Sequence, residues 1–456
     1  MNYFAIRIRI PAFWMCCWKG FLFLPRFAIK NMITERSERL HGLDHLRALA
    51  IVLVLLFHYR AFKHPEWIDT VGKFGWTGVD LFFVLSGFLI SGQLFKEMSS
   101  KGAISLKTFY IKRFFRIIPA YSFTLFLYFT IPFFREREAL PPLWKFLTFT
   151  QNYGLDVIDK GTFSHAWSLC IEEQFYLILP LVLLIVMPSK LFKYFAALIV
   201  IFMMSSLIIR FIIWNGSVAG IDNNSLDFWR CWYMKIYYPT HTRLDGLGTG
   251  VLIGYFIQYK SGFKRMVHQN GNKLLLVGTI LLGFAFWLCD DQASEGASVF
   301  GFTLVAVSYG FIVLSAVSAS SFLSKKKSYV TAQLAALSYT IYLSHKGIIH
   351  MIQKLFDQFN LENSDTVCLM LCIVGCLTGG LLYRSFIEKP VGAIKYRLLK
   401  KLKWAVYLLC GLETFFCCRL GISSAFKSLD KQINDKGESN NDSRYRPQKF
   451  LKPWNP

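Results

Sequence analysis

Polar and charged side chains stand directly before an apolar run in FSHAWSLCIEEQFYLILP, residues 163 to 180. His165, Trp167, Glu172 and Glu173 place an imidazole, an indole and two carboxylates in one short stretch. The positive dipole of a helix start explains one acid, but not two acids beside a histidine and a tryptophan. We therefore expect an aromatic, hydrogen-bonding site for a hydroxylated ligand such as a sugar.

A second candidate group comes from LRALAIVLVLLFHYR and GVDLFFVLSGFLIS. Arg47 and His58 are eleven residues apart, so on a helix they share one face about 16 Å apart along the axis. Asp80 is expected at the depth of His58, where a carboxylate would orient the imidazole as a catalytic base. The alternative is that Arg47 is a snorkelling anchor and that His58 only reaches the membrane interface.

Three bases within about one helical turn, Lys112, Arg113 and Arg116, lie in FYIKRFFRIIPAY. Topology alone explains bases at the cytoplasmic end of a span. The functional alternative is an anion site, because guanidinium geometry suits the phosphates of a nucleotide-bearing donor.

Further polar residues are expected at the outer ends of two later apolar segments. Arg243 and Asp245 lie in HTRLDGL, and His345 lies in SYTIYLSHKGI. Like the cluster of residues 163 to 180, they suit contacts with an acceptor entering from the outer side.

The elements that must position these residues are membrane helices. Of the 456 residues, 54% are hydrophobic and 44 are phenylalanine, which is too apolar for an ordinary soluble domain. The net charge of +23 comes from Lys and Arg between apolar segments rather than from one basic surface, which argues against nucleic-acid binding. Eleven cysteines show no spacing suited to zinc, so we expect no metal.

A membrane span needs roughly 20 apolar residues, and the chain offers about ten such segments. We therefore predict an all-α integral membrane protein. Basic residues dominate alternate connections, so both termini are predicted to be cytoplasmic. The spans lie near residues 46–62, 76–95, 117–134, 170–187, 194–213, 243–258, 273–289, 299–316, 332–349 and 366–387.

The ends of the chain differ from this core. Residues 1–40 form an N-terminal extension, and Met32 suggests an over-long gene start. After a transmembrane domain at 41–395, residues 396–423 are predicted to be a basic and apolar interfacial segment. Residues 424–456 are polar and predicted to be disordered. Because no soluble catalytic domain follows, any chemistry is expected in the membrane bundle.

Together these segments, with TRLDGLGTGVLIG, LSYTIYLSH and YRSFIEKP, resemble the membrane acyltransferase-3 family over roughly residues 40 to 395. The resemblance implies ten transmembrane helices in the plasma (inner) membrane, acyl-CoA as the donor substrate and no bound cofactor. It also implies that Arg47 and His58 are needed for activity. The basic motif often opens with Arg in the family, whereas this chain has Lys112, which puts bidentate phosphate binding there in doubt.

From these expectations we predict a membrane O-acyltransferase that moves acetyl from acetyl-CoA to an envelope polysaccharide, lipopolysaccharide or lipid-linked sugar. Arg47, Lys112, Arg113 and Arg116 would bind the donor. His58, Asp80 and Glu172 would be catalytic, with His58 as a general base or an acyl-carrying nucleophile. The acceptor would be bound by His165, Trp167, Glu173, Arg243, Asp245 and His345. A transporter or flippase for glycan precursors is the alternative, because polar residues through a bundle also mark transport pathways.

Overall fold

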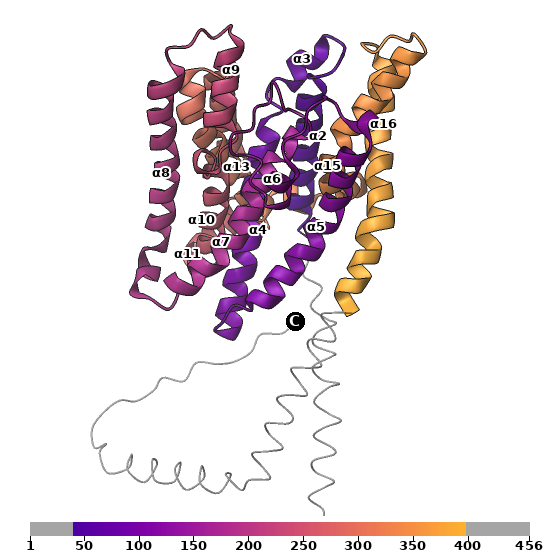
Figure 1. Cartoon of the computed structure of the whole chain (residues 1–456). Helices are drawn as coiled ribbons and strands as arrows, with labels where there is room; N and C mark the ends of the chain where they lie inside the picture. Colours follow the sequence, from indigo (N-terminus) through magenta and orange to yellow (C-terminus); the bar gives the residue numbers. More distant parts are fainter. Residues whose placement is uncertain (1–39, 398–456) are drawn as a thin grey trace, which may run out of the picture. The chain divides into compact units, whose positions relative to one another are not determined.

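The computed structural model describes residues 40–397, and every regular element within that range is a helix (Figure 1). A helix stands at each of the ten predicted spans, with ends that differ by several residues. These helices are α2 (His41–Tyr59), α4 (Thr77–Lys101), α5 (Leu106–Thr130), α7 (Trp167–Val186), α8 (Phe195–Ile213), α10 (Asp245–Tyr259), α12 (Gly271–Leu288), α13 (Phe302–Ala316), α15 (Tyr329–Gln358) and α16 (Thr366–Tyr383).

Shorter helices join the long ones. A π-helix, η5 (Tyr233–Tyr237), continues α9 and carries tyrosines toward the middle of the bundle. Other connecting helices are α3 (Trp67–Gly72), α6 (Leu143–Leu147), α9 (Leu226–Trp232), α11 (Ser261–Gln269) and α14 (Phe322–Lys325), with a 3₁₀ turn η2 (Ser164–Ala166) before α7 and π-helices η7 (Ala297–Gly301) and η8 (Arg384–Glu388).

Seven helical stretches of the described residues are long and apolar enough to cross a membrane. They contain α2, α4, α7, α8, α12, α13 and α16. The remaining three candidates differ: α10 has only 15 residues, and α5 and α15 carry charged side chains along their length. An all-helical, multi-pass membrane protein is therefore confirmed, whereas ten crossings with two cytoplasmic termini stay a prediction.

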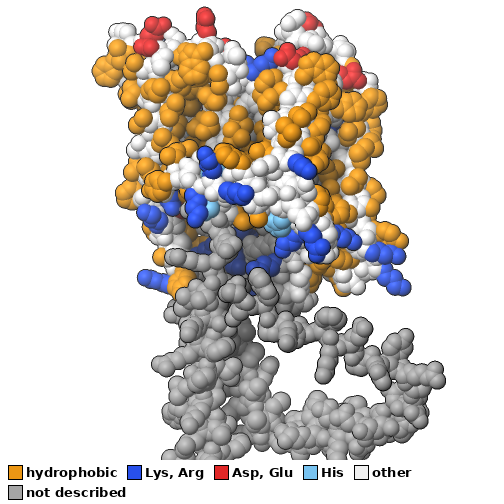
Figure 2. All heavy atoms as spheres, turned by 180° about the vertical axis from the view of Figure 1, so that it is seen from behind, with side chains coloured by type: hydrophobic (Ala, Val, Ile, Leu, Met, Phe, Trp, Pro, Cys, Tyr) orange, Lys and Arg blue, Asp and Glu red, His pale blue; other side chains and the backbone are white. Residues whose placement is uncertain are grey.

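The surface has the charge distribution of a membrane protein. Figure 2 shows a broad band of hydrophobic side chains, with acidic side chains gathered at one end and most Lys and Arg toward the other. Large apolar residues of the long helices, such as Ile185, Ile201 and Trp287, are exposed. The asymmetry is the one expected when the basic end faces the cytoplasm.

Close packing of α4 against α10 positions much of the interior. A Cβ atom added to Gly87 would collide with the carbonyl oxygen of Leu247, and one added to Gly250 would collide with the carbonyl oxygen of Val84. Glycines at this crossing let the two backbones approach, as small residues do between membrane helices. The crossing brings the first turns of α4 and α10 together.

The chain divides into two compact units, Met1–Glu388 and Lys389–Pro456. The bundle and both cavities below belong to the first. Residues 389–397, the described part of the second, are helical. The predicted extension at 1–40 lies outside the described residues except for Leu40. The predicted disordered tail at 424–456 and nearly all of the interfacial segment at 396–423 also lie outside them.

Candidate functional site

His58 and His345 form the centre of the candidate site. His58 is near the end of α2, His345 is in the middle of α15, and the His58 Nδ1 to His345 Nε2 distance is 2.8 Å. Their rings are stacked with centroids 4.9 Å apart. The sequence analysis placed His345 with the acceptor, and the structure instead places it directly against the predicted base.

The hydrogen bonds around His345 determine which ring nitrogens carry protons. His345 Nδ1 lies 2.8 Å from the carbonyl oxygen of Tyr342 and 3.2 Å from that of Ile341. Because carbonyl oxygens only accept, Nδ1 of His345 carries the proton, and in the neutral ring Nε2 is an acceptor. His58 must then donate through Nδ1, which leaves a lone pair on its Nε2. That is the tautomer a general base or nucleophile requires.

A third histidine completes the group. The ring of His165 lies 4.8 Å from that of His345 and 5.9 Å from that of His58, measured between centroids. His165 Nε2 donates to the carbonyl oxygen of Leu343 at 3.3 Å, and its buried Nδ1 has no hydrogen-bond partner among the described residues. The three rings come from α2, η2 and α15.

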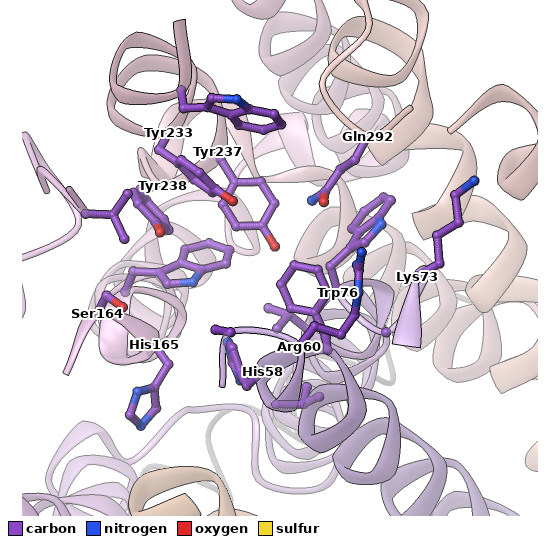
Figure 3. A pocket seen from close by; sticks show the side chains of 18 of the residues that line it. His58, Arg60, Lys73, Trp76, Ser164, His165, Tyr233, Tyr237, Tyr238 and Gln292 are labelled. Atoms are coloured by element: carbon purple, nitrogen blue, oxygen red, sulfur yellow. The ribbon is translucent and has the colours of Figure 1, made fainter. Parts of the chain in front are cut away.

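His58 and His165 open onto a cavity of about 540 Å³, here called the histidine cavity (Figure 3). Tyr233, Tyr237 and Tyr238 lie on one side in Figure 3, with Arg60, Lys73 and Trp76 across from them. The amide nitrogen of Gln292, which also lines the cavity, has no hydrogen-bond partner in the described part of the chain. Aromatic faces with free polar groups suit a ligand that carries several hydroxyls.

A second, smaller cavity of about 150 Å³ is lined by Arg47, Arg113 and Arg116 and is here called the arginine cavity. Glu172 and Glu173 also line it. Glu172 accepts hydrogen bonds from the hydroxyls of Ser86 at 2.9 Å and Tyr176 at 3.0 Å. Lys112 is not among the lining residues, so the structure brings together three of the four predicted donor-binding bases.

The two cavities are separated by a thin partition, and Val79 lines both. On α7, Trp167 lines the histidine cavity and Ser168 the arginine cavity. The Tyr342 hydroxyl donates to the carbonyl oxygen of His165 at 2.6 Å and lies 2.5 Å from the Ser168 hydroxyl. Val79 and the first turn of α7 thus border both cavities.

The predicted contact between Asp80 and His58 is not formed. Asp80 Oδ1 instead accepts a hydrogen bond from Arg243 at 2.8 Å, and both side chains are almost fully buried. The guanidinium of Arg243 also stacks on the ring of Phe302, 3.9 Å from its centroid. Asp80 faces α10 because the α4–α10 crossing places it there, and His345 rather than Asp80 is the hydrogen-bond partner of His58.

Arg243 and Asp245, predicted to bind the acceptor, line neither cavity. Asp245 pairs with Arg210 of α8, whose side chain has no exposed surface. Arg210 also donates to the carbonyl oxygens of Thr242 at 2.7 Å and Val299 at 2.9 Å. These two buried pairs link α4, α8, α10 and η7, and the acceptor role of Arg243 and Asp245 stays a prediction that the cavity lining does not support.

Glu172 and Glu173 face the arginine cavity rather than the histidine cavity, and only His165 and Trp167 of the opening cluster line the latter. The reason is the start of α7 at Trp167, three residues before the predicted 170. Glu172 therefore lies in the second turn, about 7.5 Å along the helix from its start. The structure therefore does not group the two acids with His165 and Trp167, and their roles in acceptor binding and catalysis stay predictions.

Several residues of the site were missed from the sequence. Lys346 lines the histidine cavity and donates to the Ser164 hydroxyl at 3.2 Å. Glu136, in the loop after α5, accepts a hydrogen bond from the backbone amide of Phe163 at 3.0 Å, and burial raises the pKa of its carboxyl. Arg210 was detectable in principle, as a charged residue within the apolar run SSLIIRFII.

The described residues contain no group of three or more His, Cys, Asp or Glu that could hold a metal.

Fold and site together define a polytopic membrane protein with a buried histidine pair beside the larger of two cavities. The model of the acyltransferase domain family matches residues 40–385, and the chain belongs to this family.

Two curated relatives are the O-acetyltransferases OatA of Staphylococcus aureus strains NCTC 8325 and COL. The chain is 28% identical to each over 372 residues, which is 77% of this chain and 57% of the relative. The chain thus spans about half the length of the curated relatives it matches. No solved structure matches the chain.

Proposed function

We propose that this protein is a membrane-bound O-acetyltransferase that moves acetyl from acetyl-CoA to a hydroxyl of a cell-envelope glycan or lipid-linked sugar. The observation that carries the proposal is the hydrogen bond from His58 Nδ1 to His345 Nε2, which leaves the lone pair on His58 Nε2 beside the histidine cavity. Membership of the acyltransferase family favours this reading over a transporter, because a transporter needs no such oriented base.

The arginine cavity is the proposed donor site. Arg47, Arg113 and Arg116 offer guanidinium groups to the phosphates of acetyl-CoA, and the thioester reaches toward the partition at Val79. Lys112 does not line this cavity, and its donor role stays a prediction outside the proposal. Because the arginines cluster at the end of the bundle predicted to be cytoplasmic, the donor would enter from the compartment that contains CoA.

The histidine cavity is the proposed acceptor site. Trp167 and the tyrosines of η5 would stack on sugar rings, while Gln292 and the tyrosine hydroxyls would bond to sugar hydroxyls. His165, on the same wall as His58, borders the reacting hydroxyl.

In the reaction, His58 Nε2 takes the proton of the acceptor hydroxyl while that oxygen bonds to the thioester carbonyl carbon. The carbon–sulfur bond then breaks, and the departing CoA thiolate receives the proton from His58. The products are the acetyl ester and CoA-SH, so no other reactant is consumed. His345 keeps its proton on Nδ1 and accepts from His58 throughout, which stabilises the imidazolium as it forms.

The test is label transfer from radiolabelled acetyl-CoA into glycan and lipid fractions of membranes containing wild type, His58→Ala or no enzyme. His350→Ala is the matched control, since His350 lies on α15 but lines neither cavity. Wild type and His350→Ala should label the same fraction, and His58→Ala at equal abundance should not. Label that is independent of His58 would refute the mechanism.

A further inference from the structure

Charge on the wall of the histidine cavity is distributed unevenly. Two of its carboxylates are neutralised by neighbours: Asp69 accepts from Arg60 at 3.0 Å, and Asp290 pairs with Lys73. A third, Asp291, accepts from the backbone amide of Ala293 at 3.0 Å. The acids and bases near α3 and Asp290 therefore largely satisfy one another.

Lys346 differs from those bases. Its ammonium group lines the same cavity as His58, and no carboxylate of the described residues lies within ion-pair distance of it. Its hydrogen bond to Ser164 at 3.2 Å uses one of three donors. A half-buried ammonium with free donors favours an anion as its partner.

Arg137 lies on the same part of the cavity wall. Its guanidinium donates to the carbonyl oxygen of Val157 at 2.7 Å and makes no ion pair within the described chain. Its neighbour Glu136 does not line the cavity, because that carboxylate binds the backbone amide of Phe163. The buried Glu136 carboxylate acts electrostatically on Lys346 from behind the wall, and Arg137 adds a second positive charge nearby. Two cations thus face the cavity beside Ser164 against one acid, which leaves one positive charge unmatched.

We propose that Lys346, supported by Ser164 and Arg137, binds an anionic group of the acceptor. The chemical class is a sugar that carries a carboxylate or a phosphate, bound so that one of its hydroxyls reaches His58. This inference rests on the proposed function, which makes the histidine cavity the acceptor site. Binding of an anionic sugar to the cavity can nevertheless be tested without measuring acetyl transfer. It makes Lys346 a specificity residue, which selects acidic over neutral sugars with the same hydroxyl pattern.

The experiment measures binding to the purified full-length chain in lipid nanodiscs, by the fluorescence of Trp76, Trp167 and Trp229, which line the cavity. The probes are methyl glucuronide, methyl glucoside and glucose 6-phosphate, which differ at C6 and, for the phosphate, also in the free anomeric hydroxyl. At least one anionic probe should bind about tenfold more tightly than the glucoside, the scale of one charge-assisted hydrogen bond. The anionic probe that binds more tightly than the glucoside shows whether the site takes a carboxylate or a phosphate.

Lys346→Gln should remove the preference and Lys346→Arg should keep most of it. Lys354→Gln is the matched control, since Lys354 is an exposed lysine of α15 that packs over Phe133 and lines neither cavity. Equal binding of all three probes to wild type, or a preference that survives in folded Lys346→Gln, would overturn the inference. Selective binding without acetyl transfer from acetyl-CoA would overturn the proposed function and leave the anion site standing.

Discussion

Replacing His345 tests the central pair without removing the base itself. His345→Leu deletes the acceptor of the 2.8 Å bond from His58 Nδ1 and leaves a buried donor without a partner. A hydrogen bond to a charged group contributes roughly 1.5–3 kcal/mol, and the bond matters most when His58 is an imidazolium. We therefore expect kcat to fall roughly 10- to 150-fold, with KM for acetyl-CoA little changed, because the arginine cavity is untouched.

The assay is CoA-SH release under saturating acetyl-CoA and acceptor, on protein whose folding is checked by its thermal unfolding temperature. His345→Gln keeps a side-chain acceptor and should recover part of the loss. Loss of the base in His58→Ala should cost more, within the roughly 10²- to 10⁴-fold range of general base catalysis. If His345→Leu is as inactive as His58→Ala and His345→Gln recovers nothing, His345 is itself the reacting base and the assigned tautomers are wrong.

Three further predictions follow from the placement of charged residues. Asp80→Asn should lower the free energy of unfolding by about 3–5 kcal/mol, because it leaves the buried charge of Arg243 unpaired; Asp80→Leu combined with Arg243→Leu should cost less in the same denaturant titration, and equal costs would argue against the pairing. Arg113→Gln should raise KM for acetyl-CoA about tenfold and leave KM for the acceptor unchanged. A change confined to the KM for the acceptor would mean that the arginine cavity binds the acceptor and not the donor. Cysteines at Asn223 and Lys326 should react with an impermeant maleimide from opposite sides, outside for 223 and inside for 326; the reverse pattern would invert the bundle.

Distances along a single helix were predictable from the sequence. Arg47 and His58 share a face of α2 about 16 Å apart. In the structure Arg47 lines the arginine cavity and His58 lines the histidine cavity. The helical class and the positions of the long helices were predictable for the same reason, since both depend on local composition and length. The contacts of a residue with a neighbouring helix depend on how the helices pack, so they could not be predicted from the local sequence.

A shift of one helix start shows how small errors change a site. Moving the beginning of α7 back to Trp167 carries Glu172 and Glu173 one turn deeper, from the expected acceptor site to the arginine cavity. The 3₁₀ turn η2 before α7 has no periodic signal that would have located this boundary. The composition near a helix end indicates that a polar site is present. It does not indicate whether the polar residues line the histidine cavity or the arginine cavity.

The partner of Asp80 shows why depth alone is an insufficient guide. Asp80 and His58 were matched because both were expected at a similar depth, but a side chain also has a direction around its helix. Gly87 lies two turns after Asp80, so both are on the same face of α4. That face packs against α10, where the glycine permits close contact, and Asp80 consequently meets Arg243, two residues before α10 begins. The small residue marked the packing face in the sequence, whereas only the assembled bundle shows that α10 covers it and that His58 turns instead to α15.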